Sequence, residues 1–73
     1  MDKQTRIDQA DKIAKATDGK VWTKEDGDVV RVYIGKGFAQ VNEDGVNIDR
    51  VPGNKFTEAK AACEAMGVRA YRK

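Results

Sequence analysis

The sequence predicts a small two-layer α+β domain with the element order α-β-β-β-β-α-β, in which an antiparallel meander sheet carries both helices on one face. Three observations lead to this class. Two segments with helical apolar spacing flank a middle third rich in β-branched residues. Glycine-containing turns divide that middle third into short strands. The 73 residues suffice for one domain, residues 1–73, and the single cysteine cannot form an internal disulfide, so stability must come from packing.

The first element is a helix over residues 2–17. Its apolar residues recur at helical spacing and predict a thin buried stripe that needs a sheet beneath it. The stripe consists of Ile7, Ala10, Ile13, Ala14 and Thr17. We expect the charged residues between them, Arg6 among them, to face water. Gly19 is the expected left-handed residue that ends the helix.

Four strands follow, each separated from the next by a dipeptide that contains glycine. The strands are predicted at residues 20–24, 29–34, 37–42 and 46–51. The dipeptides are Asp26-Gly27, Gly35-Lys36 and Asp44-Gly45. The Asp-Gly pairs favour type I′ hairpin turns, and glycine in the first place favours type II′.

If each turn has two central residues, the strand registers follow by counting. The predicted pairs are Thr23–Val30, Val32–Ala39 and Val41–Ile48. Paired residues in antiparallel strands share a face. One face, the inner face, then collects Val21, Thr23, Val30, Val32, Ala39, Val41, Val46 and Ile48. A one-residue slip would turn a whole strand over, so the agreement among three turns supports this register.

A second helix is predicted over residues 57–66, with Thr57 as its N-cap and Gly67 as its end. A short last strand over residues 68–71 would follow it. Cys63 lies on the apolar stripe of this helix, which predicts a small core residue and not a nucleophile.

The composition excludes most catalytic chemistry. The chain has no histidine and no serine, which removes the common general base, the usual nucleophile pairs and histidine metal sites. We therefore expect no enzyme and no cofactor. Five acidic residues near two turns could form a weak calcium or magnesium site, but solvated turn residues explain them better. They are Glu25, Asp26, Asp28, Glu43 and Asp44.

The other side of the sheet, the outer face, is where we expect function. On the predicted register it carries Lys20, Trp22, Lys24, Val29, Arg31, Tyr33, Phe38, Gln40, Asn42, Asn47, Asp49 and Val51. The last strand could add Arg69 and Tyr71. The candidate binding residues are its rings and cations: Lys20, Trp22, Lys24, Arg31, Tyr33, Phe38, Arg69 and Tyr71. Rings flanked by cations are typical of surfaces on which single-stranded bases stack.

These features predict a non-catalytic domain that binds a macromolecule, with single-stranded nucleic acid ranked first. The alternatives are a protein-binding adaptor or inhibitor, or a homodimer, because Trp, Tyr, Phe and Arg are also enriched at protein interfaces. Trp22 could instead turn into the core through a bulge, or one helix could cover each face. We expect no membrane partner, since no apolar run approaches ~20 residues. The unpaired cysteine favours a cytoplasmic location.

Overall fold

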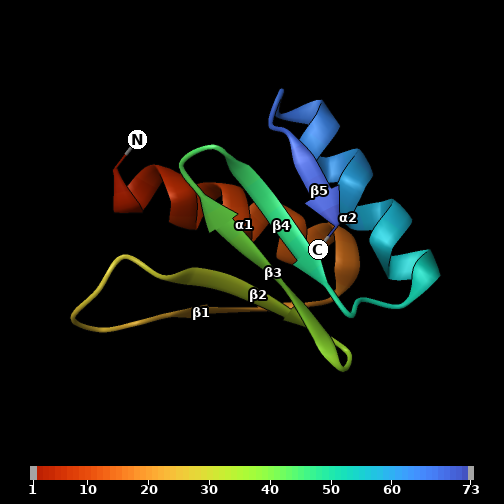
Figure 1. The fold of residues 1–73 in the computed structure, drawn as a ribbon, viewed down its shortest axis with the longest axis horizontal. Coiled ribbons are helices and arrows are strands. Elements are labelled where there is room, and N and C mark those ends of the chain that lie inside the picture. Colours follow the sequence, from red (N-terminus) through yellow and green to blue (C-terminus); the bar gives the residue numbers. More distant parts are fainter. Residues whose placement is uncertain (1, 73) are drawn as a thin grey trace.

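The structure is a computed structural model that describes residues 2–72, and it contains two helices and one five-stranded sheet (Figure 1). The elements are α1 (Lys3–Thr17), β1 (Lys20–Thr23), β2 (Val30–Ile34), β3 (Gly37–Asn42), β4 (Gly45–Asp49), α2 (Gly53–Ala65) and β5 (Ala70–Arg72). The predicted α+β class and element order are confirmed.

The strands lie in the sheet in sequence order, from β1 at one edge to β5 at the other. The first four form the predicted antiparallel meander, whereas β5 pairs with β4 in parallel. The expectation of an entirely antiparallel sheet is therefore wrong for the last strand. The reason is the connection: α2 carries the chain back along the sheet, so β5 can run in the same direction as β4.

The first hairpin has the predicted register, with Thr23 opposite Val30. Its turn is not type I′, because neither Asp26 nor Gly27 has a positive φ. The ladder extends instead to the Lys24 N–H, which donates to the Val29 carbonyl at 3.1 Å, and residues 25–28 form a wider turn. An even number of turn residues leaves the pairing and the inward side of each strand as predicted.

The second hairpin also has the predicted register, with Val32 opposite Ala39 and Tyr33 opposite Phe38. Gly35 has a φ of 60°, and Lys36 is not among the residues of positive φ. This combination fits the predicted type II′ turn, in which only the first central residue needs a positive φ.

The third hairpin differs from the prediction by one turn position. Val41 pairs with Val46 and not with Ile48, because Glu43 and Asp44 form the turn and Gly45 already belongs to β4. The register moves by two residues, so the inward side of the strand is unchanged. Gly45 is required for a different reason: a Cβ there would lie 2.6 Å from the carbonyl oxygen of Arg69, where the chain enters β5.

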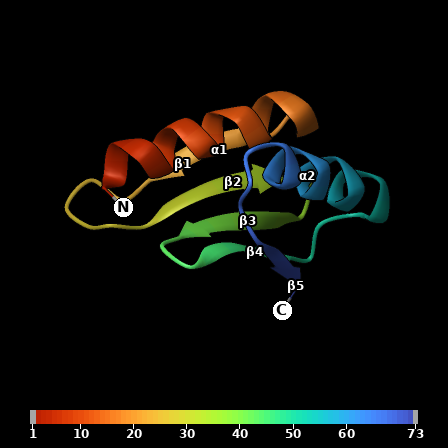
Figure 2. The ribbon, with the colours of Figure 1, turned by 90° about the horizontal axis from the view of Figure 1, so that it is seen from above.

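Both helices pack on the inner face, as predicted, and the sheet forms the second layer (Figure 2). Small residues of the helices lie over the β-branched residues of the strands. The buried core consists of Ala10, Ile13, Val30, Val32, Ile34, Ala39, Val41, Val46, Ile48, Val51, Ala59 and Cys63. Val51 was expected on the outer face and is only 3% exposed. Arg50 adopts a left-handed φ of 58° directly after β4, so the strand alternation does not continue to Val51.

The first helix begins and ends on aspartates. Asp2 Oδ1 accepts the N–H of Thr5 at 2.8 Å, and this hydrogen bond lowers the pKa of the Asp2 carboxyl below its usual 3.8. Asp18, with a φ of 57°, is the left-handed residue at the other end, so the role expected for Gly19 is wrong. Gly19 is needed instead because the backbone at this position packs closely against Val32: a Cβ there would lie 2.6 Å from Val32 Cγ1.

The second helix begins earlier than predicted. Its first residue is Gly53, and Thr57 does not cap it, since Thr57 Oγ1 donates to the Gly53 carbonyl inside the first turn. The other end is as predicted. Gly67 has a φ of 70°, and the Val68 N–H donates to the Cys63 carbonyl at 2.9 Å, which is the Schellman arrangement.

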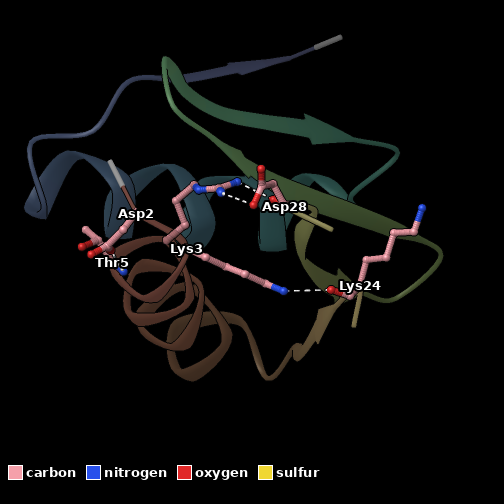
Figure 3. A network of polar contacts seen from close by, with 6 residues as sticks. Asp2, Lys3, Thr5, Lys24 and Asp28 are labelled. Atoms are coloured by element: carbon pink, nitrogen blue, oxygen red, sulfur yellow. Dashed lines mark hydrogen bonds and ion pairs between the residues drawn. The ribbon is translucent and has the colours of Figure 1, made fainter. Parts of the chain in front are cut away.

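Polar contacts tie the start of α1 to the first hairpin turn (Figure 3). Arg6 was expected to face water but is only 7% exposed; its Nη1 donates to the Asp28 carbonyl, and Nη2 lies 3.7 Å from Asp28 Oδ1. Lys3 Nζ donates to the Lys24 carbonyl at 2.8 Å. The side chain of Lys24 itself points away from α1.

Candidate functional site

The outer face of the sheet is not covered by either helix, because α1 and α2 both lie on the inner side (Figure 2). This arrangement excludes the alternative in which one helix covers each face. Strand pairing brings most of the predicted outer-face residues together. They are Lys20, Trp22, Arg31, Tyr33, Phe38, Gln40, Asn42, Asn47, Asp49 and Tyr71.

Trp22 and Tyr33 form the exposed part of the aromatic cluster. Trp22 is 44% exposed and Tyr33 is 41% exposed. Their ring centroids are 6.3 Å apart in an edge-to-face arrangement. The alternative in which a bulge turns Trp22 into the core is therefore excluded. Both residues are therefore partly exposed to solvent.

Phe38 continues the cluster but is not freely exposed. Its ring centroid lies 6.0 Å from that of Tyr33, as expected for a cross-strand aromatic pair. The guanidinium carbon of Arg31 lies over the Phe38 ring, 4.5 Å from its centroid. The guanidinium therefore covers one face of the Phe38 ring.

A ladder of side-chain hydrogen bonds crosses the face, and the sequence did not predict it. Arg31 Nε donates to Gln40 Oε1 at 2.9 Å, and Arg31 Nη1 donates to the Tyr33 hydroxyl at 3.3 Å. Gln40 Nε2 donates to Asn42 Oδ1 at 3.0 Å, and Asn42 Nδ2 donates to the Tyr71 hydroxyl at 3.3 Å. The sequence held one signal for this ladder: the amide side chains of Gln40 and Asn42 are two residues apart on β3 and therefore share a face.

Tyr71 lies apart from the other rings. It pairs with Asn47 of β4 and is half-buried. Arg69 precedes β5 and is exposed, with its guanidinium carbon 5.4 Å from the centroid of the Tyr71 ring. The eight candidate binding residues thus fall into two groups, a larger one around Trp22 and a smaller one at Tyr71.

The charge of the larger group is positive. Lys20 and Lys24 are exposed on either side of Trp22 in the sequence, and Arg31 lies opposite Trp22 on β2. Among the strand residues of the outer face, Asp49 is the one carboxylate, and it pairs with Phe38 at the far side of the cluster. Lys24 lies just after β1, next to the exposed turn residues Glu25 and Asp26, so Lys20 and Arg31 are the basic residues of this group on the strands themselves.

Other chemistry has little support in the described part of the chain. Cys63 is fully buried, as predicted, and burial raises the pKa of its thiol to about 11, with a smaller contribution from Glu64. Within residues 2–72, no three acidic or cysteine side chains are grouped to hold a metal ion, and no pocket is present. Neither of the two helices is long and apolar enough to cross a membrane.

The fold and this face together define a class: a small α+β domain with an uncovered aromatic and basic sheet surface. No family model, curated protein or solved structure matches the chain.

Proposed function

We propose that this chain is a non-catalytic domain that binds single-stranded nucleic acid on the outer face of its sheet. The observation that carries the proposal is the pair of exposed rings, Trp22 and Tyr33, beside two lysines: Lys20 lies opposite Tyr33, and Lys24 follows Trp22 by two residues. A base that stacks on an aromatic side chain contributes about 1–3 kcal/mol, whatever its identity. Lys20 and Lys24 would attract the phosphates that link such bases.

A single strand fits this surface better than a duplex. Stacking on Trp22 and Tyr33 requires bases that are free of their own neighbours, and these occur in single strands, loops and ends. The unpaired Cys63 suits a reducing compartment, so we place this activity in the cytoplasm.

The test measures the affinity for a labelled oligothymidylate. Its fluorescence anisotropy is followed as protein is added, at several salt concentrations. We expect binding at low salt that weakens as salt rises. The double variant Lys20→Gln/Lys24→Gln should weaken binding and make the slope of log affinity against log salt shallower by about 1.4, since each lost phosphate contact removes ~0.7.

The matched control is Lys12→Gln/Lys15→Gln, which removes the same charge from exposed positions of α1 on the other layer. It should leave affinity and slope close to those of the unmodified protein. Equal effects of the two double variants would mean unspecific attraction to a basic molecule. Absence of oligonucleotide binding at low salt would end the proposal.

A protein interface is the second candidate, and the exposed Trp22 is the observation that favours it. Tryptophan and arginine dominate the energetics of protein interfaces. In this case the chain would dimerise or dock on another protein through the same face. Sedimentation that shows a dimer abolished by Trp22→Ala, together with no oligonucleotide binding, would support this alternative.

A further inference from the structure

The position of Arg31 on the outer face points to a role other than phosphate binding. Its guanidinium stacks on Phe38, with the guanidinium carbon 4.5 Å from the ring centroid, and both residues are half-buried. One face of the Phe38 ring is therefore covered by the arginine. A group that approaches this face of the ring meets the guanidinium.

Two of the three guanidinium nitrogens of Arg31 already donate hydrogen bonds within the protein. Nε donates to Gln40 at 2.9 Å and Nη1 donates to Tyr33 at 3.3 Å. Arginine holds a phosphate best through two parallel donors on one edge of the guanidinium. Each of the two edges that could do so includes one of these occupied nitrogens. A phosphate bound in this way would compete with one of these two hydrogen bonds, and the same two bonds hold the plane of the guanidinium in place.

We propose that Arg31 is a stacking plane for a nucleobase, supported on its other side by the Phe38 ring. This inference rests on the proposed function and names how the same face holds its ligand. Guanidinium planes stack on unpaired bases as aromatic side chains do. The face then has three neighbouring stacking positions, namely Trp22 on β1, Tyr33 on β2, and Arg31, which stacks on Phe38 of β3. Lys20 and Lys24 are left as the phosphate contacts.

The decisive variant is Arg31→Lys, which keeps the charge and removes the plane. If Arg31 stacks on a base, oligothymidylate affinity should fall about tenfold, in line with the loss of one stacking contact. The salt slope should stay unchanged. Arg31→Gln should also weaken binding with little change in slope, whereas the one-charge control Lys24→Gln should make the slope shallower by about 0.7.

Two results would overturn the inference. Arg31→Lys with unchanged affinity, combined with a shallower slope for Arg31→Gln, would make Arg31 a phosphate contact. Tighter binding by Arg31→Gln would mean that the arginine only obstructs Phe38. These outcomes require that the unmodified protein binds, so they are distinct from failure of the proposed function.

A direct measurement distinguishes stacking of Arg31 on a base from a role in which Arg31 only holds Tyr33 in position through their hydrogen bond. In the unmodified protein, NMR signals of the Arg31 side-chain protons should move upfield when the oligonucleotide is added, because a stacked base shields protons above its ring. Unmoved signals, at saturating oligonucleotide, would contradict the stacking role even if Arg31→Lys binds weakly. Thermal unfolding of each variant serves as the control for folding.

Discussion

Arg6 shows how a charged side chain can join two elements in this small molecule. Its side chain is buried, and it donates to the Asp28 backbone carbonyl, while its contact with the Asp28 carboxylate is longer and the carboxylate is 89% exposed. A hydrogen bond from a charged donor contributes more than an exposed ion pair does. The backbone contact is therefore the more important half of this interaction.

We predict that Arg6→Ala lowers the free energy of unfolding by about 2–3 kcal/mol, because it removes this hydrogen bond and the packing of the arginine stem. Asp28→Asn, which keeps the backbone carbonyl, should cost less than about 1 kcal/mol. Urea denaturation of both variants tests the difference. Equal losses would show that the carboxylate is the important partner.

Cys63 should be unreactive toward thiol reagents in the folded protein. Burial raises the pKa of its thiol to about 11, so it should resist a thiol reagent at pH 8 and react only when urea unfolds the chain. Fast labelling without denaturant would contradict the buried position.

The same shift has a consequence for stability at alkaline pH. The unfolded thiol ionises near the ordinary value of 9.0 and the folded thiol only near 11, so its contribution is complete below pH 9 and is lost as pH rises toward 11. Since lysines and tyrosines titrate in the same range, the measurement compares the unmodified protein with Cys63→Ala. The variant should lose less stability than the unmodified protein when the pH rises from about 8 to about 10, because this range spans the ordinary thiol pKa of 9.0.

At the scale of the elements, close approach between neighbouring segments explains which glycines matter. A Cβ at Gly37, the first residue of β3, would lie 2.3 Å from both the Asp49 carbonyl oxygen and the Arg50 carbonyl carbon. At Gly53, the first residue of α2, a Cβ would meet no atom within 4 Å.

The substitution Gly37→Ala should therefore lower the free energy of unfolding by about 3 kcal/mol or prevent folding, because backbone must move. Gly53→Ala should stabilise the protein by up to about 1 kcal/mol through helix propensity. Chemical denaturation of the pair tests this contrast. A mild effect of Gly37→Ala would mean that the β3–β4 pairing adjusts easily.

The elements also show how far the sequence could predict the fold. The inward side of each strand in the three hairpins was predictable even where the turn was not. In the third hairpin, the residue opposite Val41 is Val46 and not Ile48, which is a shift by two residues and leaves the same side chains facing inward. The direction of β5 was not, since a helical connection permits either sense. Buried Arg6 was missed because periodicity cannot distinguish a charged side chain that snorkels to a carbonyl from one that faces water.

For the site, the sequence predicted the residues of the outer face and the strand pairing that brings them together, such as Tyr33 opposite Phe38, but not the hydrogen bonds between their side chains. The exposure of Trp22 and Tyr33 followed from the alternation of β1 and β2. The cover that Arg31 forms over Phe38 depends on which of several nearby partners a long side chain selects, and alternation does not decide this. The residues of the face and their pairing across the strands were thus predictable, whereas the side-chain contacts of Arg31 were not.

At the scale of the whole molecule, the single tryptophan reports the charge of its surroundings. Trp22 is 44% exposed and has Lys20 two residues before it and Lys24 two residues after it. We predict emission typical of an indole in water, and stronger quenching by iodide than by caesium, because cations raise the local concentration of anions.

The preference for iodide should shrink as inert salt is added, since screening at 0.1 M acts over about 10 Å. It should also shrink in Lys20→Gln/Lys24→Gln and persist in Lys12→Gln/Lys15→Gln. Blue-shifted emission that neither ion quenches would mean that the indole is buried in solution, and the proposed site would then not exist.

The strand that carries Trp22 is also a border of the sheet, since β1 is the terminal strand in the order. Such borders invite edge-to-edge association between copies, and short length and lysines are known defences. β1 has four residues, and in a two-fold arrangement with the tryptophans opposite each other, Lys20 of one copy would face Lys24 of the next. One pair of ammonium groups would thus both recruit a polyanion and keep identical molecules from polymerising.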